Sequence, residues 1–253
     1  MILSMTVGDV QLQPVAITHR TRHGHVTEAL GMRILDGHVQ PGETLPNESA
    51  LCADLGVGRG TLREAVKALE AKGLVESRPR TGTRVRPRDR WNFLDSDLLR
   101  WMQRSDSLRL LSDLADLRRS IEPGAARLAA ERATDEDRAS LHAAYDLMMA
   151  SCRKEGLEGF SEADLAFHMA LLHACHNDLY VSLGHAIEIA LRASFERGMA
   201  VPGAVSASIP RHQLILSAIM VGDGDAASAA AIGLIDAAVR DIDAAIRLMG
   251  AES

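Results

Sequence analysis

Hydrophobic residues recur at helical spacing along most of this chain of 253 residues. Val26, Leu30 and Ile34 mark one face of a segment over residues 22–36, which predicts a first helix closed by Gly37. After Trp91 the same period predicts helices over residues 94–103, 107–132, 135–155, 160–175, 178–198, 207–221 and 224–249. The pattern therefore predicts a mainly α fold that ends in an antiparallel bundle of six to seven helices.

A different pattern occupies the segment between the first helix and this bundle. It predicts, in order, short helices over residues 49–55 and 60–72, strands over residues 74–77 and 83–86, and a basic hairpin tip over residues 78–82. Gly56 to Gly58 form the turn between the two helices, and Gly73 is placed to end the second helix. Two helices followed by a β-hairpin are the elements of a winged helix-turn-helix, so we predict a DNA-reading unit here.

Composition narrows the class of protein. Hydrophobic residues make up 47% of the chain and aromatic residues only 3%, which favours a helical core built from aliphatic side chains. No run approaches the ~20 apolar residues that a membrane span needs, and the N-terminus has no secretory-signal pattern. Cys52, Cys152 and Cys175 lie far apart, without metal-knuckle spacing. We expect a cytoplasmic protein with reduced thiols and no membrane partner.

Charge is distributed unevenly between the two parts of the chain. The net charge is −6, but residues 1–90 hold 13 Lys and Arg against 10 Asp and Glu, whereas residues 91–253 hold 15 against 24. Residues 78–90 alone contain six arginines and one aspartate. This asymmetry favours a basic DNA-reading head on an acidic body.

The motifs in both parts resemble those of the GntR family of transcriptional regulators, in the FadR-type branch with an all-helical ligand-binding (FCD) domain. The matching motifs of the head are Pro41-Gly42-Glu43, Leu45-Pro46-x-Glu48, Leu55-Gly56-Val57-x-Arg59, Leu62-Arg63-Glu64-Ala65 and Gly82-Thr83. Those of the body are Leu117-Arg118-x-x-Ile121-Glu122-Pro123, Asp164-x-x-x-His168, His176-Asn177 and Arg211-His212. Within that branch, Trp91-Asn92-x-Leu94-Asp95-x-Asp97 and Phe195-Glu196-Arg197 resemble the galactonate-operon repressor group.

The resemblance implies a domain organisation and a mode of action. The expected parts are a flexible extension over residues 1–18, a winged helix-turn-helix domain over 19–86, a linker over 87–93, and a helical effector-binding and dimerisation domain over 94–250. Members of this branch are typically homodimers that bind palindromic operators on double-stranded DNA and release them when a metabolite binds. The expected function is a ligand-responsive repressor of genes for the catabolism of sugar acids or related carboxylates.

Several residues of the head are candidates for contacts with DNA. The resemblance implies that Arg59, Thr61 and Arg63 face the bases, and an arginine can bond O6 and N7 of one guanine. The candidates for phosphate or minor-groove contact at the hairpin are Arg78, Arg80, Gly82 and Arg84. Gly58 and Ser49 depart from the family pattern, so contacts at those two positions do not follow. The alternative is a structural helical hairpin with solvated arginines.

Three residues of the body form a candidate metal site. Asp164 and His168 lie four residues apart and therefore on one face of a helix, and His212 begins a later one. A carboxylate and two imidazoles suit zinc, and also manganese or nickel. The spacing alone fits an ordinary polar pair equally well. The resemblance identifies the three as metal ligands, with Leu234 in place of the usual fourth histidine.

Two arginines are candidates for binding a carboxylate effector. Arg118 lies in an otherwise apolar helix, where an unpaired cation would be costly. It either pairs with Glu122 one turn away or clamps the carboxylate of a ligand, and the resemblance favours the clamp. Arg192 is a second candidate for a polar contact to the effector.

Two other functions compete with the regulator. One is a metal-dependent hydrolase or lyase that uses Asp164, His168 and His212, although no catalytic triad, phosphate loop or pair of catalytic glutamates accompanies them. The other is a constitutive DNA-binding protein whose body only dimerises, so that no small molecule would change its affinity for DNA.

The two classes of DNA contact can be separated by mutation. We expect Arg59→Ala or Arg63→Ala to relax sequence preference, because a base-reading contact is lost, and Arg80→Ala to weaken binding to every sequence alike. Affinities for cognate and scrambled duplexes at fixed salt measure both effects. Equal losses on the two duplexes for Arg59→Ala would refute its base-reading role.

Overall fold

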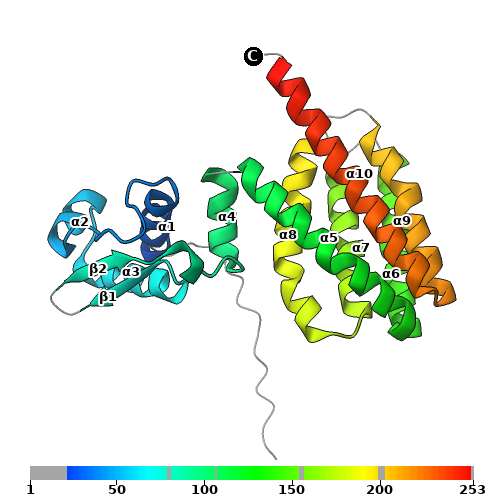
Figure 1. The fold of residues 1–253 in the computed structure, drawn as a ribbon, viewed down its shortest axis with the longest axis horizontal. Coiled ribbons are helices and arrows are strands. Elements are labelled where there is room, and N and C mark those ends of the chain that lie inside the picture. Colours follow the sequence, from blue (N-terminus) through cyan, green and yellow to red (C-terminus); the bar gives the residue numbers. More distant parts are fainter. Residues whose placement is uncertain (1–21, 79–80, 106, 154–156, 199–202, 252–253) are drawn as a thin grey trace, which may run out of the picture. The chain divides into compact units, whose positions relative to one another are not determined.

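The computed structural model describes residues 22–78, 81–105, 107–153, 157–198 and 203–251. The chain divides into two compact units between Trp91 and Asn92. Figure 1 shows a small unit with three helices and a hairpin and a larger, wholly helical unit. The predicted extension over residues 1–18 lies outside the described residues.

The first unit contains three α-helices in its described residues, α1 (Arg22–Leu35), α2 (Glu48–Leu55) and α3 (Arg59–Ala71). The side chain of Asn47 accepts a hydrogen bond from the Ala50 N–H and so caps the start of α2. Gly56 ends α2 in the left-handed conformation, with φ +63°. Gly58 begins α3 without a side-chain cap. The turn therefore requires a glycine-favouring conformation at Gly56, and it sets α3 directly after α2.

A two-stranded antiparallel wing follows α3. Strands β1 (Val75–Arg78) and β2 (Gly82–Val85) pair with Val75 opposite Val85 and Arg78 opposite Gly82. Both strands lie one residue closer to the tip than predicted. The reason is that Arg78 and Gly82, predicted as part of the tip, pair with each other and extend the ladder.

The segment predicted as a linker contains ordered structure. The short 3₁₀ helix η1 (Arg88–Arg90) leads into Trp91, which is buried. The Trp91 Nε1–H donates a hydrogen bond to the Arg86 carbonyl at 3.0 Å, and the Arg88 guanidinium lies 5.3 Å from the centre of the indole ring. These contacts attach the start of the segment to the first unit.

The second unit is a helical bundle. Its helices in the described residues are α4 (Ser96–Ser105), α5 (Ser107–Arg132), α6 (Asp135–Arg153), α7 (Leu157–Ala174), α8 (Asp178–Gly198), α9 (Ala204–Val221) and α10 (Gly224–Ala251). The most extensive packing joins α5 to α10, α6 to α7 and α9 to α10. Small alanines of α5 and α10 pack among larger side chains such as Phe160, Phe167 and Leu171. The predicted fold class, a winged helix-turn-helix followed by a helical bundle, is confirmed.

Helix α9 combines an apolar composition with a functional position. It is long and apolar enough to span a membrane by length and composition, the one such helix in the described residues. Its inner face buries Ile209, Ile215 and Ile219 together with His212, and the helix packs on α5, α6 and α10. We therefore interpret α9 as a core helix of the bundle.

The packing of α7 makes a direct prediction about stability. Leu171→Ala should lower the free energy of unfolding by about 2–5 kcal/mol, because Leu171 is fully buried and its removal leaves a cavity. The same substitution at Leu147, which is 58% exposed on α6, should change it by less than about 0.5 kcal/mol. Urea denaturation followed by circular dichroism measures both, and equal effects would contradict the packing described here.

Candidate functional site

Two exposed arginines of the first unit lie at the start of α3. Arg59 is its first residue and Arg63 lies one turn later, and both side chains are exposed. Thr61, between them, is half-buried. The Arg63 guanidinium contacts Glu48 at the start of α2, with Nε 2.7 Å from Oε1. The helix that the sequence predicts for base reading thus presents two cations one turn apart.

The wing residues predicted to contact DNA occupy different settings. Arg78 pairs with Glu76 on the same strand at 2.9 Å, and Arg84 donates from Nε to the Gly42 carbonyl. Gly82 has φ +85°, a conformation that a larger residue would adopt only with strain. Arg80 lies outside the described residues. The described basic side chains of the wing are exposed, as contact with phosphates requires.

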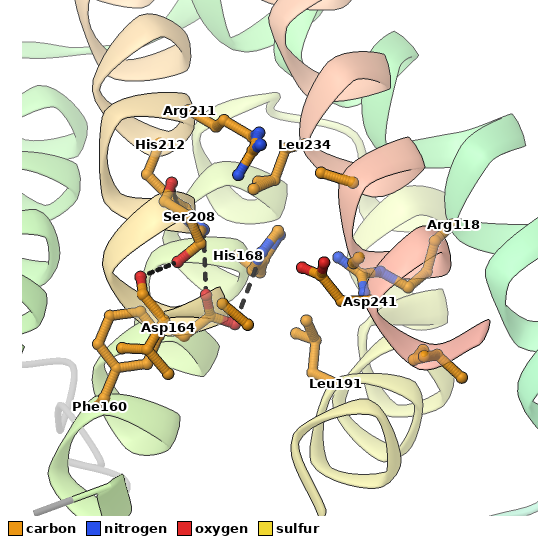
Figure 2. Close-up of a pocket in the computed structure, with 15 residues that line it drawn as sticks. Arg118, Phe160, Asp164, His168, Leu191, Ser208, Arg211, His212, Leu234 and Asp241 are labelled. Atoms are coloured by element: carbon orange, nitrogen blue, oxygen red, sulfur yellow. Dashed lines mark hydrogen bonds and ion pairs between the residues drawn. The ribbon is translucent and has the colours of Figure 1, made fainter. Parts of the chain in front are cut away.

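The three predicted metal ligands meet inside the second unit. Asp164 and His168 lie one turn apart on α7, and His212 comes from α9. One ligand atom from each lies within 4.8 Å of the other two, and all three side chains are buried. Figure 2 shows them pointing toward one another in the cavity wall, where Asp164 Oδ1 lies 3.0 Å from His212 Nε2 and Oδ2 lies 3.8 Å from His168 Nε2. The structure brings the predicted set together.

The electrostatics of the cluster favour an ionised carboxylate. Burial by itself raises the pKa of Asp164, but the close contact with the His212 imidazole and the charges of His168 and Arg118 outweigh it and hold that pKa below its usual range. His212 is oriented by the Ser208 carbonyl, 3.0 Å from its Nδ1. The Phe167 ring meets the His212 ring edge-on at 5.1 Å. The cluster is therefore charged, oriented and enclosed by apolar side chains.

The donor set fits a divalent cation. Nε2 of His212 is buried and lies close to Asp164, yet, like Nδ1 of His168 beside Glu122, it makes no hydrogen bond of acceptable geometry. A buried imidazole nitrogen without a hydrogen bond is costly, and a metal would satisfy it. Nδ1 of His168 lies 2.9 Å from Glu122 Oε2, a carboxylate on the ring nitrogen that faces away from Asp164. Carboxylates in that position commonly orient a metal-binding histidine.

Arg118 pairs with Glu122, one of the two roles that the sequence left open, and it also lies in the cavity wall. Its side chain is 5% exposed, and its Nε lies 2.5 Å from Glu122 Oε1, so the ion pair with Glu122 exists. It also lines the cavity that contains the Asp164 cluster. Burial by itself raises the pKa of Glu122, but the Arg118 and His168 charges lower it far below its usual range. The cavity therefore has a buried cation in its wall without an uncompensated charge.

The structure gives Arg192 a different position. It lies on α8 and pairs with Glu162 at 2.6 Å and with Glu188 at 3.1 Å. It is not among the residues that line the cavity in the described part of the chain. Its contact with an effector stays a prediction, and Arg192 would have to make that contact from a position outside the cavity lining.

The cavity also contains polar residues that the sequence reasoning did not select. The cavity is open to solvent on one side and has a volume of about 90 Å³, and Ser208, Arg211 and Asp241 lie in its wall (Figure 2). Leu234 is buried in the same wall, so that side is apolar at the position where the resemblance expects a fourth histidine. Asp241 lies two turns beyond Leu234 on α10, and this seven-residue spacing is the signal that could have identified it.

Two family models match the chain in the order of its two units. The model of the bacterial regulatory proteins of the gntR family matches residues 22–85, and the FCD domain model matches residues 113–237. The first match covers α1 to the end of the wing. The second contains Arg118 and the Asp164, His168 and His212 cluster.

Individual relatives agree with the family models. The galactonate operon transcriptional repressor of Escherichia coli (strain K12) is 38% identical over 213 residues, 83% of this chain and 92% of the repressor. The uncharacterized HTH-type transcriptional regulator YieP of the same organism is 36% identical over 214 residues, 83% of this chain and 90% of YieP. Among solved structures, Streptococcus agalactiae GntR is 28% identical with a TM-score of 0.51, covering 86% of this chain and 99% of that chain.

The buried ion pair of the cavity leads to a stability prediction. Glu122→Ala should lower the free energy of unfolding by about 3–5 kcal/mol, because it leaves the buried Arg118 cation unpaired. Glu162→Ala removes the ion pair with Arg192 at the surface and should change the free energy of unfolding little. Urea denaturation measures both variants. A tolerated Glu122→Ala would contradict the role of Glu122 as the compensating charge.

The two units, the family models and the relatives lead to one assignment. A gntR-type head is followed by an FCD domain in a single chain. The relatives are transcriptional regulators, and the match covers most of their length. The chain therefore belongs to the gntR family of bacterial regulatory proteins, as a DNA-binding transcriptional regulator of the FadR type and not an enzyme.

Proposed function

We propose that the chain is a ligand-responsive repressor of genes for the catabolism of sugar acids or related carboxylates, released from its operator by a small hydroxy acid. One observation carries the proposal: a single cavity of the FCD domain is lined both by the buried Asp164, His168 and His212 cluster and by buried Arg118. The name of the 38% identical relative, a galactonate operon repressor, supports the ligand class, since galactonate is a polyhydroxy acid.

The chemistry of the cavity suits such an acid. Asp164, His168 and His212 would hold a divalent ion, zinc first and manganese or nickel as alternatives. When bound, the ion supplies a Lewis acid that chelates a carboxylate and the neighbouring hydroxyl oxygen. Arg118 supplies a cation for the carboxylate, while Ser208 and Asp241 offer polar atoms for further hydroxyls.

The DNA side of the proposal concerns a homodimer on a palindromic operator in the cytoplasm. Arg59, Thr61 and Arg63 would read bases from α3 in the major groove. The wing would contact the backbone or minor groove through Arg78, Arg80, Gly82 and Arg84. A two-fold dimer reads two half-sites, so a small change in the spacing of its heads changes affinity strongly. Acid binding in the body would bias that spacing, which is an allosteric coupling between two sites.

The proposal predicts that acid binding depends on metal. Purified protein should contain about one equivalent of a divalent metal, and calorimetry with galactonate should detect binding that a chelator or Asp164→Ala abolishes, because the metal and its ligands are lost. Asp146→Ala is the matched control, since Asp146 is an exposed carboxylate one helical turn from His142 on α6. Its acid binding should match that of the unmodified chain.

Each of three outcomes would contradict a different part of the proposal. Galactonate binding that survives both the chelator and Asp164→Ala would refute the metal role. A panel of aldonates, uronates and 2-hydroxy acids of which none binds would refute the ligand class. Acids that bind without changing the affinity for DNA in a gel shift would favour a constitutive DNA-binding protein instead.

A further inference from the structure

A carboxylate holds one of the predicted base-reading arginines. Glu48 is the first residue of α2, and Arg63 lies one turn into α3. Nε of Arg63 donates to Oε1 of Glu48 at 2.7 Å, and its Nη2 donates to Oε2 at 3.3 Å. Both carboxylate oxygens are therefore engaged by one side of the guanidinium. The pair connects the two helices of the helix-turn-helix across the turn at Gly56.

The pairing leaves the other edge of the guanidinium free to bind a base. An arginine has five N–H donors, and Glu48 uses one on Nε and one on Nη2. The three remaining donors lie on Nη1 and Nη2, the edge that bonds O6 and N7 of guanine together. The Arg63 side chain is 67% exposed, so that edge is accessible. Glu48 thus fixes the side chain without occupying the groups that would read a base.

The pair also reduces the attraction of Arg63 to DNA phosphates that does not depend on sequence. The hydrogen bond from Arg63 holds the pKa of Glu48 below its usual range, and the charges of Arg63 and Arg59 act in the same direction. The carboxylate is therefore ionised and cancels the Arg63 charge as seen by distant phosphates. A neutral pair adds little to binding that does not depend on sequence, because that binding comes from net positive charge.

We propose that Glu48 is a specificity-determining positioning residue, which orients Arg63 for base reading and suppresses its attraction to phosphates. A long arginine side chain loses rotamer freedom when it binds, and a side chain already held by a carboxylate loses less. An incorrect base leaves Arg63 unsatisfied and brings the Glu48 carboxylate close to the DNA without compensation. The inference rests on the proposed base-reading role of Arg63.

Two other roles for Glu48 give different results. A purely structural link between α2 and α3 would affect the stability of the head and its affinity for all DNA alike. General repulsion of DNA by a surface carboxylate would also act equally on every sequence. Glu64 provides a matched control for charge, because it is an exposed glutamate on α3 that pairs with Lys67 at 2.9 Å.

The experiment compares full-length variants by fluorescence anisotropy at several salt concentrations without added acid. The probes are a duplex selected from a random library by the unmodified protein, its single-base-pair variants, and a scrambled duplex. For Glu48→Gln, we expect the ratio of the affinity for the selected duplex to that for the scrambled duplex to fall by about 5- to 10-fold. An arginine–guanine pair provides roughly 5- to 150-fold discrimination in all, so this loss is part of it. The loss should fall on the base pair that Arg63→Ala also affects. Binding to scrambled DNA should tighten, with a salt slope steeper by about 0.9.

The controls isolate the action through Arg63. Glu64→Gln adds the same charge and should leave the ratio unchanged, and Glu48→Gln should have no effect on the ratio in a chain that already carries Arg63→Ala. An unchanged ratio for Glu48→Gln, or a fall of the same size in the Arg63→Ala chain, would overturn the inference. If Arg63→Ala itself leaves the ratio unchanged, or no duplex is selected, the proposed base-reading role fails and the inference fails with it.

Discussion

The second unit buries several charged side chains in its core, and its structure depends on these charges compensating one another. Arg118, Glu122, Asp164, His168 and His212 are each at least nine-tenths buried in a core otherwise made of aliphatic and aromatic side chains. An isolated charge in such a core would be too costly to keep, so each polar group must contact another. Glu122 joins Arg118 to His168, and Asp164 joins His168 to His212. One connected set of contacts therefore links α5, α7 and α9.

This connected set gives the cavity its properties. The groups that would hold a metal and a carboxylate are fixed before either arrives, which reduces the ordering cost of binding. A ligand that adds negative charge beside Arg118 and the Asp164 cluster changes the balance that holds three helices together. Such a change is suited to altering the arrangement of a bundle, and in the proposed dimer it would be transmitted to the DNA-binding units. In the head, the Glu48–Arg63 pair also sets a cation beside a carboxylate, and in our proposal this cation reads a base.

Local spacing predicted the elements and the residues that share one helix. The pair Asp164 and His168 follows from the period of α7, and Arg59 and Arg63 follow from the period of α3, because a helix brings residues four apart to one face. Residue spacing could not place His212 beside Asp164, since that contact depends on how the bundle positions α7 and α9. The family resemblance supplied that grouping.

The remaining differences have the same physical origin. Arg118 was expected either to pair with Glu122 or to clamp a ligand, and only the packed bundle shows that the paired guanidinium also lines the cavity. Arg192 lies on the predicted helix but points to glutamates outside the cavity, which helix periodicity alone cannot distinguish. The observed strands are shifted by one residue from the predicted ones, because Arg78 pairs with Gly82 across the hairpin. Such pairing depends on the partner strand and cannot be read from one strand alone.

The central claim is that the cavity and the DNA-binding unit are thermodynamically coupled. Reciprocal binding is its most direct test, because an acid that weakens DNA binding by some factor must itself bind the DNA complex more weakly by the same factor. Calorimetric titration of the acid into the protein alone and into its complex with operator duplex measures both affinities. We expect the acid to bind the complex more weakly than the free protein, by the same factor by which the acid weakens DNA binding. Equal affinities of the acid for the free protein and the complex would contradict it.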